Sequence, residues 1–277
     1  MIEDQLTDEV VRNFAGAEPA RTRELIAKLV THLHAFVRDA EPTFDEWRAA
    51  IDFLTRTGQK SDATREEFIL LSDVLGVSML VDAINHRARA GATETTVLGP
   101  FYVGEHRVTA PDTDLAVGIA GDRLFVDVAV RSPAGAPIAG ATVDVWHADG
   151  DGLYDSQRPG YRTDQPRLRA RFVTDAEGRT RFRTIVPCSY PVPTDGPVGE
   201  LLRAGKRHAM RPAHVHFLIV APGFETLVTH VFVAGDDYLG SDVVYGVKPE
   251  LIVALEPGPD AASKRLAYTF VMKEIAE

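Results

Sequence analysis

The segment Arg211-Pro-Ala-His-Val-His-Phe-Leu-Ile-Val-Ala-Pro-Gly223 decides the fold of the second half of this chain. Positions 214–220 are rich in Val, Ile and other apolar residues, and Pro222-Gly223 supplies a turn. The pattern predicts a strand over 214–220 that pairs with a second strand over 227–233. Residues two apart on a strand share a face, so His214 and His216 are expected to reach the same metal ion.

Other short strands precede this pair. Residues 124–130 alternate between apolar and polar side chains, and 142–146 is predicted to be the returning strand. Residues 172–174 and 179–185 flank a turn that contains Gly178 and are predicted to form a hairpin. Repeated short strands with turn signals indicate a mainly antiparallel β-sandwich rather than alternating βαβ units.

The first hundred residues have helical periodicity instead. Apolar positions recur with helical spacing over 21–39, and Thr43 with Glu46 forms a capping-box pattern before a stripe that ends near Gly58. Thr64 with Glu67 is expected to open a third helix, and 77–89 is apolar enough to be largely buried. The sequence therefore predicts an α+β chain, with a helical domain and connector over 1–98 and a β-sandwich over 99–277.

Composition excludes several classes of protein. The chain has 277 residues and a net charge of -10, whereas nucleic-acid binding needs clustered Lys and Arg. One cysteine, Cys188, excludes an internal disulfide and a cysteine-rich zinc site. The acidic start has no apolar signal region, and no apolar run approaches the 18 or so residues that span a membrane. We expect a cytoplasmic protein with no nucleic-acid partner and no membrane span.

Two tyrosines lie in unusual settings upstream of the histidines. Tyr154 is in Asp-Gly-Leu-Tyr-Asp, and Tyr190 is in Ser-Tyr-Pro-Val-Pro. A free phenol has a pKa near 10, so tyrosine ligation requires a hard cation, and Fe(III) displaces the proton more readily than Zn(II). Other readings stay open at this point: buried tyrosines are usually core residues, and His-x-His also serves zinc hydrolases. A β-sandwich binding module would explain the strands but not the tyrosines.

Longer motifs resemble a known family. The chain reads Gly-Pro-Phe-Tyr over 99–102, Asp-Val-Trp-His-Ala over 144–148 and Asp-Gly-Leu-Tyr over 151–154. Tyr-Pro-Val-Pro over 190–193, Arg-Pro-Ala-His-Val-His over 211–216 and Thr-His-Val-Phe over 229–232 follow in order. Together they strongly resemble the intradiol ring-cleaving dioxygenases over nearly the whole chain.

The resemblance implies a site and an assembly. One non-haem Fe(III) per subunit would be bound by Tyr154, Tyr190, His214 and His216. Tyr190 would be the axial ligand that substrate displaces, with His216 opposite it, and would act as a proton acceptor. Arg211 would stabilise negative charge on the ring, and His230 would be a further catalytic group. The helical domain would form a homodimer, in which phospholipid is often bound.

The same resemblance implies a substrate. The segments 71–82 and 229–248 look most like hydroxyquinol 1,2-dioxygenases, which open 1,2,4-trihydroxybenzene with O2 to 3-hydroxy-cis,cis-muconate (maleylacetate). Catechol or chlorocatechol is the alternative, and would give cis,cis-muconates. Asp73 could accept a hydrogen bond from a third ring hydroxyl. The residues expected to line the pocket are Leu70, Asp73, Val97, Leu98, Gly99, Pro100, Phe101, Val192, Pro193, Arg211 and Val244.

Overall fold

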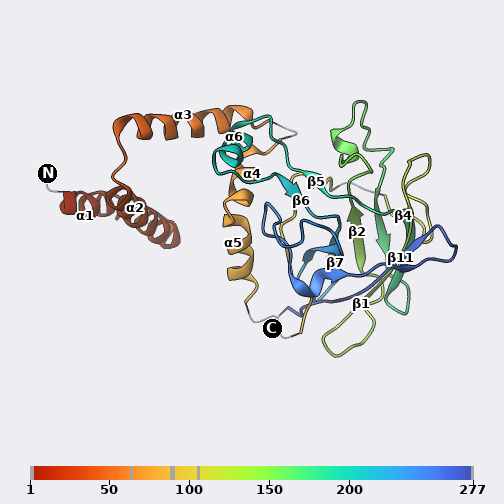
Figure 1. The fold of residues 1–277 in the computed structure, drawn as a ribbon. Coiled ribbons are helices and arrows are strands. Elements are labelled where there is room, and N and C mark those ends of the chain that lie inside the picture. Colours follow the sequence, from red (N-terminus) through yellow and green to blue (C-terminus); the bar gives the residue numbers. More distant parts are fainter. Residues whose placement is uncertain (1–2, 63–64, 88–90, 105–106, 276–277) are drawn as a thin grey trace. The chain divides into compact units, whose positions relative to one another are not determined.

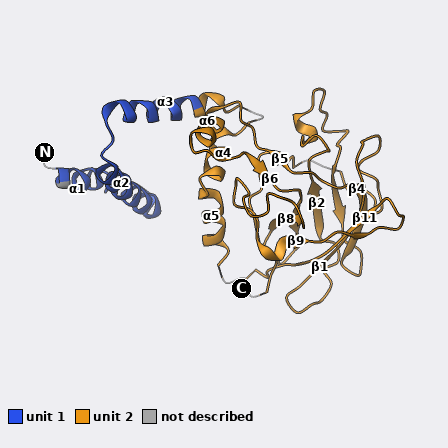
Figure 2. Cartoon of the chain, viewed as in Figure 1, with its two compact units in different colours: residues 1–56 blue, residues 57–277 orange. Residues whose placement is uncertain are grey.

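A computed structural model describes residues 3–62, 65–87, 91–104 and 107–275. The chain divides into two compact units, residues 1–56 and 57–277 (Figure 2). The boundary lies inside helix α3 (Phe44–Lys60), so the helices that follow α3 belong to the second unit. A functional domain division at residue 98 stays a prediction.

The first unit contains α1 (Glu3–Asn13), α2 (Ala20–Ala40) and most of α3. Thr7 on α1 joins the first two helices: its Oγ1 accepts a hydrogen bond from Arg38 at 2.9 Å and lies 3.0 Å from Nδ1 of His34. The capping box before α3 is confirmed, since the Thr43 amide donates to Glu46 at 2.8 Å and the Glu46 amide donates back to Thr43 Oγ1 at 3.3 Å.

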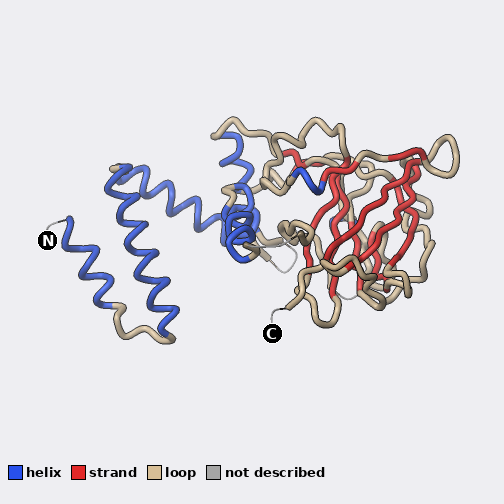
Figure 3. The backbone as a smooth tube through the Cα atoms, turned by 90° about the horizontal axis from the view of Figure 1, so that it is seen from below, coloured by secondary structure: helices blue, strands red, loops and turns tan. Residues whose placement is uncertain are grey.

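The second unit has three more helices, α4 (Glu67–Val74), α5 (Val77–Asn85) and α6 (Pro197–Ala204), which lie to one side of the strands (Figures 1 and 3). The expected helix opening at Thr64 lies outside the described residues, and the described helix begins at Glu67. Among the described residues, none of the helices has the combined length and apolar character needed to cross a bilayer.

The expectation that 77–89 is largely buried is wrong for the described part of that segment. Met79 is buried, but Leu80 is 61% exposed and Val81 is 53% exposed. A short amphipathic helix buries the face that contacts its neighbour, here α4. The apolar residues on the other faces of α5 stay exposed among the residues that the structure describes.

The strands form two main sheets and a short ribbon. One sheet has the order β10-β11-β1-β4, the other β3-β2-β7-β8-β9, and β5 pairs with β6. Pairing is antiparallel except between β1 and β11 and between β8 and β9. The strands are β1 (Arg123–Arg131), β2 (Thr142–Trp146), β3 (Arg169–Val173), β4 (Arg179–Ile185), β5 (Tyr190–Pro191), β6 (Met210–Arg211), β7 (His214–Val220), β8 (Leu227–Val233), β9 (Ile252–Val253), β10 (Glu256–Pro257) and β11 (Lys264–Val271).

The core lies between the two main sheets. Phe172 on β3 stacks on Phe182 on β4 with ring centroids 5.1 Å apart, and Phe217 on β7 packs against Phe270 on β11 at 4.8 Å. Alternate residues of each strand supply this layer, as the period of two requires. The predicted helical domain and mainly antiparallel β-sandwich are confirmed. The site histidines lie on the opposite face of β7.

Two predicted strand pairings are wrong. Residues 142–146 do not return beside 124–130, and 172–174 does not form a hairpin with 179–185, because both connections cross from one sheet to the other. The turn between β3 and β4 is present, with the Asp175 amide donating to the Arg179 carbonyl at 2.9 Å. Alternating apolar residues and a turn are common to hairpins and to arches between sheets, so the pattern does not distinguish them. The pairing of β7 with β8 is confirmed.

Candidate metal centre and active site

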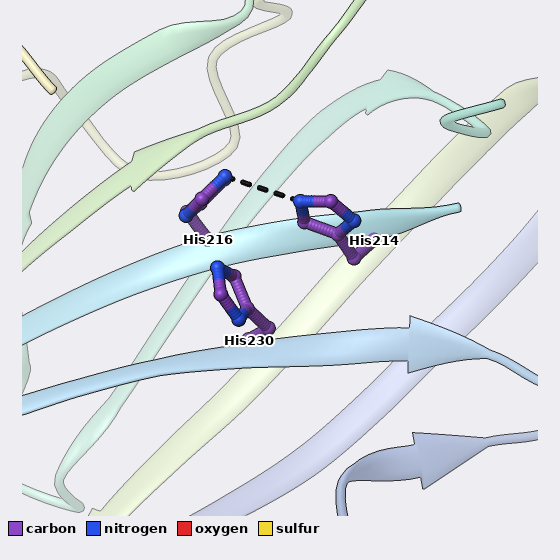
Figure 4. A group of neighbouring side chains, drawn as sticks. All are labelled: His214, His216 and His230. Atoms are coloured by element: carbon purple, nitrogen blue, oxygen red, sulfur yellow. Dashed lines mark hydrogen bonds between the residues drawn. The ribbon is translucent and has the colours of Figure 1, made fainter. Parts of the chain in front are cut away.

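A row of three aromatic rings crosses the outer face of the five-stranded sheet. Register places Trp146 on β2 opposite His216 on β7, and His216 opposite His230 on β8. Trp146 stacks on His216 with centroids 4.6 Å apart and planes inclined by 14°, and His230 meets His216 edge to face at 4.2 Å. His214 and His216 leave β7 on one face, with His230 beside them from the next strand (Figure 4). The prediction that the two β7 histidines share a face is therefore confirmed.

Two loops bring the tyrosines to these histidines. Tyr154 precedes the short 3-10 helix Asp155–Gln157, and its amide donates to the Gln157 side chain at 2.9 Å. Tyr190 lies on β5, opposite Arg211 on β6. Gly152 passes close to Tyr190: a Cβ at this position would lie 2.6 Å from the Tyr190 Cβ, and its φ of +78° also favours glycine.

Four donor atoms converge at this point. The Tyr154 hydroxyl lies 2.9 Å from the Tyr190 hydroxyl, 2.8 Å from His216 Nε2 and 3.5 Å from His214 Nε2. The two histidine Nε2 atoms are 3.1 Å apart. Ligands bonded at about 2.1 Å and at right angles around a metal lie about 3 Å from one another, so these separations suit a shared cation. All four side chains are buried.

Burial controls protonation in the cluster. It holds the pKa of His214 and His216 well below the usual range, so both imidazoles are neutral and can donate a lone pair. Burial, followed by the neighbouring phenol, raises the pKa of Tyr154 well above its usual value. Burial also raises the pKa of Tyr190, against the opposing effect of the Arg211 charge. Deprotonating two such phenols requires a strongly charged cation, which restricts the metals that suit this site.

Contacts outside the donor set orient it. His214 Nδ1 lies 2.6 Å from the Pro212 carbonyl, which fixes the proton on Nδ1 and leaves Nε2 free to bind a metal. Phe101 stacks on Tyr154 with ring centroids 4.6 Å apart. Gly99 approaches His216 closely, because a Cβ there would lie 3.4 Å from its Cε1 atom. These neighbours pack directly against the cluster.

The predicted catalytic groups border the same cluster. Arg211 is buried, and its Nη1 lies 3.2 Å from His214 Nε2. His230 Nδ1 lies 2.5 Å from the hydroxyl of Thr96, and its Nε2 has no hydrogen-bond partner among the described residues. One nitrogen from each of His214, His216 and His230 lies within 4.8 Å of the others, so this histidine cluster can hold a metal ion.

The predicted pocket residues occupy different environments. Asp73 is 3% exposed although it lies on helix α4, and burial raises its pKa. Its Oδ1 is buried without a hydrogen-bond partner among the described residues. The charges of Arg211 and Asp242 also act on Asp73, which places it within electrostatic range of the cluster. Of the remainder, Leu70, Val192 and Val244 are buried, Val97, Gly99, Phe101 and Pro193 are half-buried, and Leu98 and Pro100 are exposed.

Three neighbours of the cluster have no counterpart among the predicted site residues. Trp146 stacks on His216, Thr96 contacts His230, and Asp242 pairs with Arg211. Trp146 could have been found from strand register, since it ends a strand that pairs with β7. Thr96 and Asp242 lie outside the helices and strands, where no periodic pattern indicates the direction of a side chain.

Similar proteins match both halves of the chain. A family model described as Dioxygenase matches residues 97–274, and one described as Catechol dioxygenase N terminus matches residues 19–93. A 6-chlorohydroxyquinol 1,2-dioxygenase from Cupriavidus pinatubonensis is 50% identical and aligns with 96% of this chain and 96% of its own. A hydroxyquinol 1,2-dioxygenase from a Rhizobium species is 45% identical over 94% of this chain and 88% of its own.

Solved structures agree with these relatives. The hydroxyquinol 1,2-dioxygenase of Pseudomonas putida has a TM-score of 0.91 and 45% identity, with 99% of both chains covered. A catechol 1,2-dioxygenase from Pseudomonas arvilla has a TM-score of 0.82 and 31% identity, and covers 99% of this chain and 92% of its own.

A helical region, a β-sandwich and a buried cluster of histidines and tyrosines together define a ring-cleaving dioxygenase, a class of non-haem iron enzyme. Within that class, the chain belongs to the intradiol ring-cleavage dioxygenase family.

Proposed function

We propose that this enzyme cleaves hydroxyquinol between adjacent hydroxyls with O2, at one Fe(III) per subunit bound by Tyr154, Tyr190, His214 and His216. The convergence of two phenol oxygens and two imidazole nitrogens at separations of 2.8–3.5 Å carries the proposal. Two anionic oxygens and two neutral nitrogens form a hard donor set that suits ferric iron better than zinc. When bound, Fe(III) would supply a Lewis acid that an aromatic diol can chelate through both oxygens, and it would draw electron density from the ring so that the ring reacts with O2.

The residues around the donor set have separate roles. Tyr190, as the tyrosinate that metal binding would leave, accepts a proton from the incoming diol; its oxygen adjoins Tyr154 and the charge of Arg211. Arg211 presents a permanent cation beside His214, where it stabilises negative charge that develops on the ring. His230 Nε2, which has no hydrogen-bond partner in the described part of the chain, offers a polar contact for a substrate oxygen. Phe101 and Trp146 limit access of water to the cluster.

Asp73 distinguishes hydroxyquinol from catechol in this proposal. A buried carboxylate oxygen without a partner is costly to desolvate, and a third ring hydroxyl would satisfy it. The names of the relatives from Cupriavidus and Rhizobium support hydroxyquinol or a chlorinated hydroxyquinol as the substrate.

We also propose a cytoplasmic location and a homodimer through the N-terminal helices, which bind phospholipid there. The dimer is supported by Leu29 and Phe36 of α2, which are 65% and 63% exposed.

A substrate panel tests the proposal. Oxygen uptake and product absorbance would be measured with hydroxyquinol, 6-chlorohydroxyquinol, catechol and chlorocatechols. We expect the highest kcat/KM for hydroxyquinol or its chlorinated form, one O2 consumed per ring and a muconate-type dicarboxylate as product. A preference for catechol would refute the role of Asp73 in selecting hydroxyquinol, and an aldehyde product would refute intradiol cleavage.

A further inference from the structure

The guanidinium of Arg211 lies between two fixed groups. On one side its Nη1 is 3.2 Å from Nε2 of His214. On the other, its Nε and Nη2 face the carboxylate of Asp242 at 3.3 and 3.5 Å. Both side chains are buried, with Arg211 4% and Asp242 5% exposed. Burial alone would lower the pKa of Arg211, but the charge of Asp242 raises it, so the cation is permanent.

The carboxylate is itself held by the loop that carries it. Asp242 Oδ2 accepts a hydrogen bond from the Gly246 amide at 2.9 Å, and Oδ1 accepts one from the Val244 amide at 3.3 Å. Gly246 leaves room for the pair, because a Cβ there would lie 3.2 Å from both Arg211 Nη2 and Asp242 Oδ2. The backbone amides of this loop therefore fix the position of the Asp242 carboxylate, and the carboxylate in turn fixes the orientation of the Arg211 guanidinium.

We propose that Asp242 is a positioning residue, which acts through Arg211 and fixes the direction of its guanidinium toward the reacting ring. The inference rests on the role given to Arg211 in the proposed function. A long flexible cation needs such an anchor, because a misplacement of about 1 Å in a catalytic group can lower the rate about 100-fold.

Without Asp242, the guanidinium has another buried carboxylate to approach. Asp73 lies within electrostatic range of Arg211, and its Oδ1 has no hydrogen-bond partner among the described residues. If Arg211 turned toward Asp73, it would leave the ring and also occupy the group proposed to bind the third hydroxyl. Loss of Asp242 should therefore lower both the rate and the preference for hydroxyquinol over catechol.

A double-mutant cycle on the iron-loaded enzyme tests this coupling. Asp242→Asn keeps the size of the side chain and removes its charge. We expect kcat for hydroxyquinol to fall by at least ~10-fold, with iron content and the visible spectrum retained. In an Arg211→Ala background the same change should alter kcat by less than about 2-fold, since the group it positions is absent. Asp127→Asn, which removes a half-buried carboxylate paired with Arg179 and Arg265, is the charge control and should leave kcat unchanged.

The outcomes separate the two proposals. If Arg211→Ala lowers kcat while Asp242→Asn has no effect, or has the same effect in both backgrounds, the positioning role is refuted and the proposed function stands. If Arg211→Ala itself leaves kcat unchanged, the role of Arg211 fails and the positioning role fails with it.

A second variant covers the case in which Asp242→Asn does not fold. Gly246→Ala retains both charges but forces the pair to shift, and should lower kcat in the parent and not in the Arg211→Ala background. Chemical rescue gives an independent readout, since Asp242 borders a surface pocket of about 520 Å³ and its truncation would leave space for a small anion. Formate should restore part of kcat in Asp242→Ala and none in Arg211→Ala. The inference would be overturned if formate gave no rescue in a folded, iron-loaded Asp242→Ala enzyme and the effects of Asp242→Asn and Arg211→Ala on kcat were additive.

Discussion

At the scale of single residues, the proposed metal site joins two histidines of one strand to two tyrosines from distant segments of the chain. Tyr154 and Tyr190 are 36 positions apart: Tyr154 precedes the short 3-10 helix, and Tyr190 lies on the two-residue strand β5. The two histidines could be placed on one face from strand period alone, because the spacing of two residues is unambiguous in a strand. The tyrosines could not be placed by period, because their segments are too short to show one. Their unusual settings made them candidates, and the resemblance to a family then implied that both are ligands.

Replacing Tyr154 by Phe tests the ligand set. The aromatic stack on Phe101 would be retained, but one phenol oxygen would be lost from the cluster. We expect iron affinity to fall by more than about 100-fold, because loss of a ligand exceeds the effect of an outer-sphere change. Iron content by elemental analysis and the intensity of the visible band measure this. Full iron occupancy with an unchanged spectrum would exclude Tyr154 as a ligand.

Replacing Asp73 by Ala tests the substrate preference. Hydrogen bonds to charged groups contribute about 1.5–3 kcal/mol, which corresponds to a loss of roughly 10- to 150-fold in kcat/KM for hydroxyquinol. Catechol has no third hydroxyl, so its kcat/KM should change by less than about 3-fold. Steady-state oxygen uptake on both substrates gives the comparison, and an equal loss on both would mean that Asp73 does not select the third hydroxyl.

At the scale of elements, the two faces of β7 have separate tasks. Phe217 points into the sandwich while His214 and His216 point into the site. Strand existence was predictable here, and the bounds of β2 agree with the expected 142–146. Strand pairing was predictable only for β7 and β8. The connections β1–β2 and β3–β4 required knowledge of which faces pack together, and this is a property of the folded core rather than of one segment.

Phe217→Ala should reduce the stability of the sandwich core without reducing iron binding at the other face of β7. Truncation of a buried Phe costs about 3–5 kcal/mol, so the free energy of unfolding should fall by that amount in chemical denaturation. Iron affinity of the folded fraction should change far less than in Tyr154→Phe, since the ring lies on the other side of the strand. A large loss of iron with little loss of stability would contradict this division of faces.

His147 links the two sheets through a hydrogen bond, and its contribution to the free energy of unfolding depends on pH. It follows β2, its Nε2 lies 2.7 Å from the hydroxyl of Thr184 on β4, and burial lowers its pKa from 6.5 to about 4. The unfolded chain therefore binds a proton that the folded chain excludes between about pH 6.5 and 4, and the contribution of His147 is lost as pH falls through this window. Between pH 7 and pH 5, the proton uptake of His147 on unfolding should lower the free energy of unfolding by about 2 kcal/mol.

Replacing His147 by Gln isolates this effect from the other buried histidines. The difference in unfolding free energy between pH 7 and 5 should shrink by about 2 kcal/mol in His147→Gln relative to the parent protein, measured by urea denaturation at both pH values. The same pH dependence in both proteins would show that His147 is protonated, or exposed, in the folded state.

At the scale of the whole molecule, the helical region carries apolar surface that one chain does not bury. Leu29 and Leu33 on α2 are 65% and 54% exposed. The helices themselves were predictable from their periodicity, but their partner was not, because an apolar stripe is the same whether it packs within a chain or between chains. For the same reason the expected burial of 77–89 was wrong for the described part of that segment.

A double substitution, Leu29→Glu with Leu33→Glu, tests the proposed dimer. Two charges on this stripe should lower the dimerisation constant by at least about 100-fold, since buried unpaired charges are costly in an apolar interface. Sedimentation or light scattering would then show a monomer, and a matched Arg21→Glu variant at an exposed position would remain dimeric. A parent protein that is monomeric at working concentration would refute the proposal directly.

The most direct test of the central claim is the iron content and visible spectrum of concentrated purified protein. Two tyrosinates on Fe(III) predict one iron per subunit and a red-brown colour from charge transfer, which shifts when hydroxyquinol is added without oxygen and weakens in Tyr154→Phe. A colourless protein that contains zinc, or no metal, and that does not consume oxygen with any diol, would contradict it.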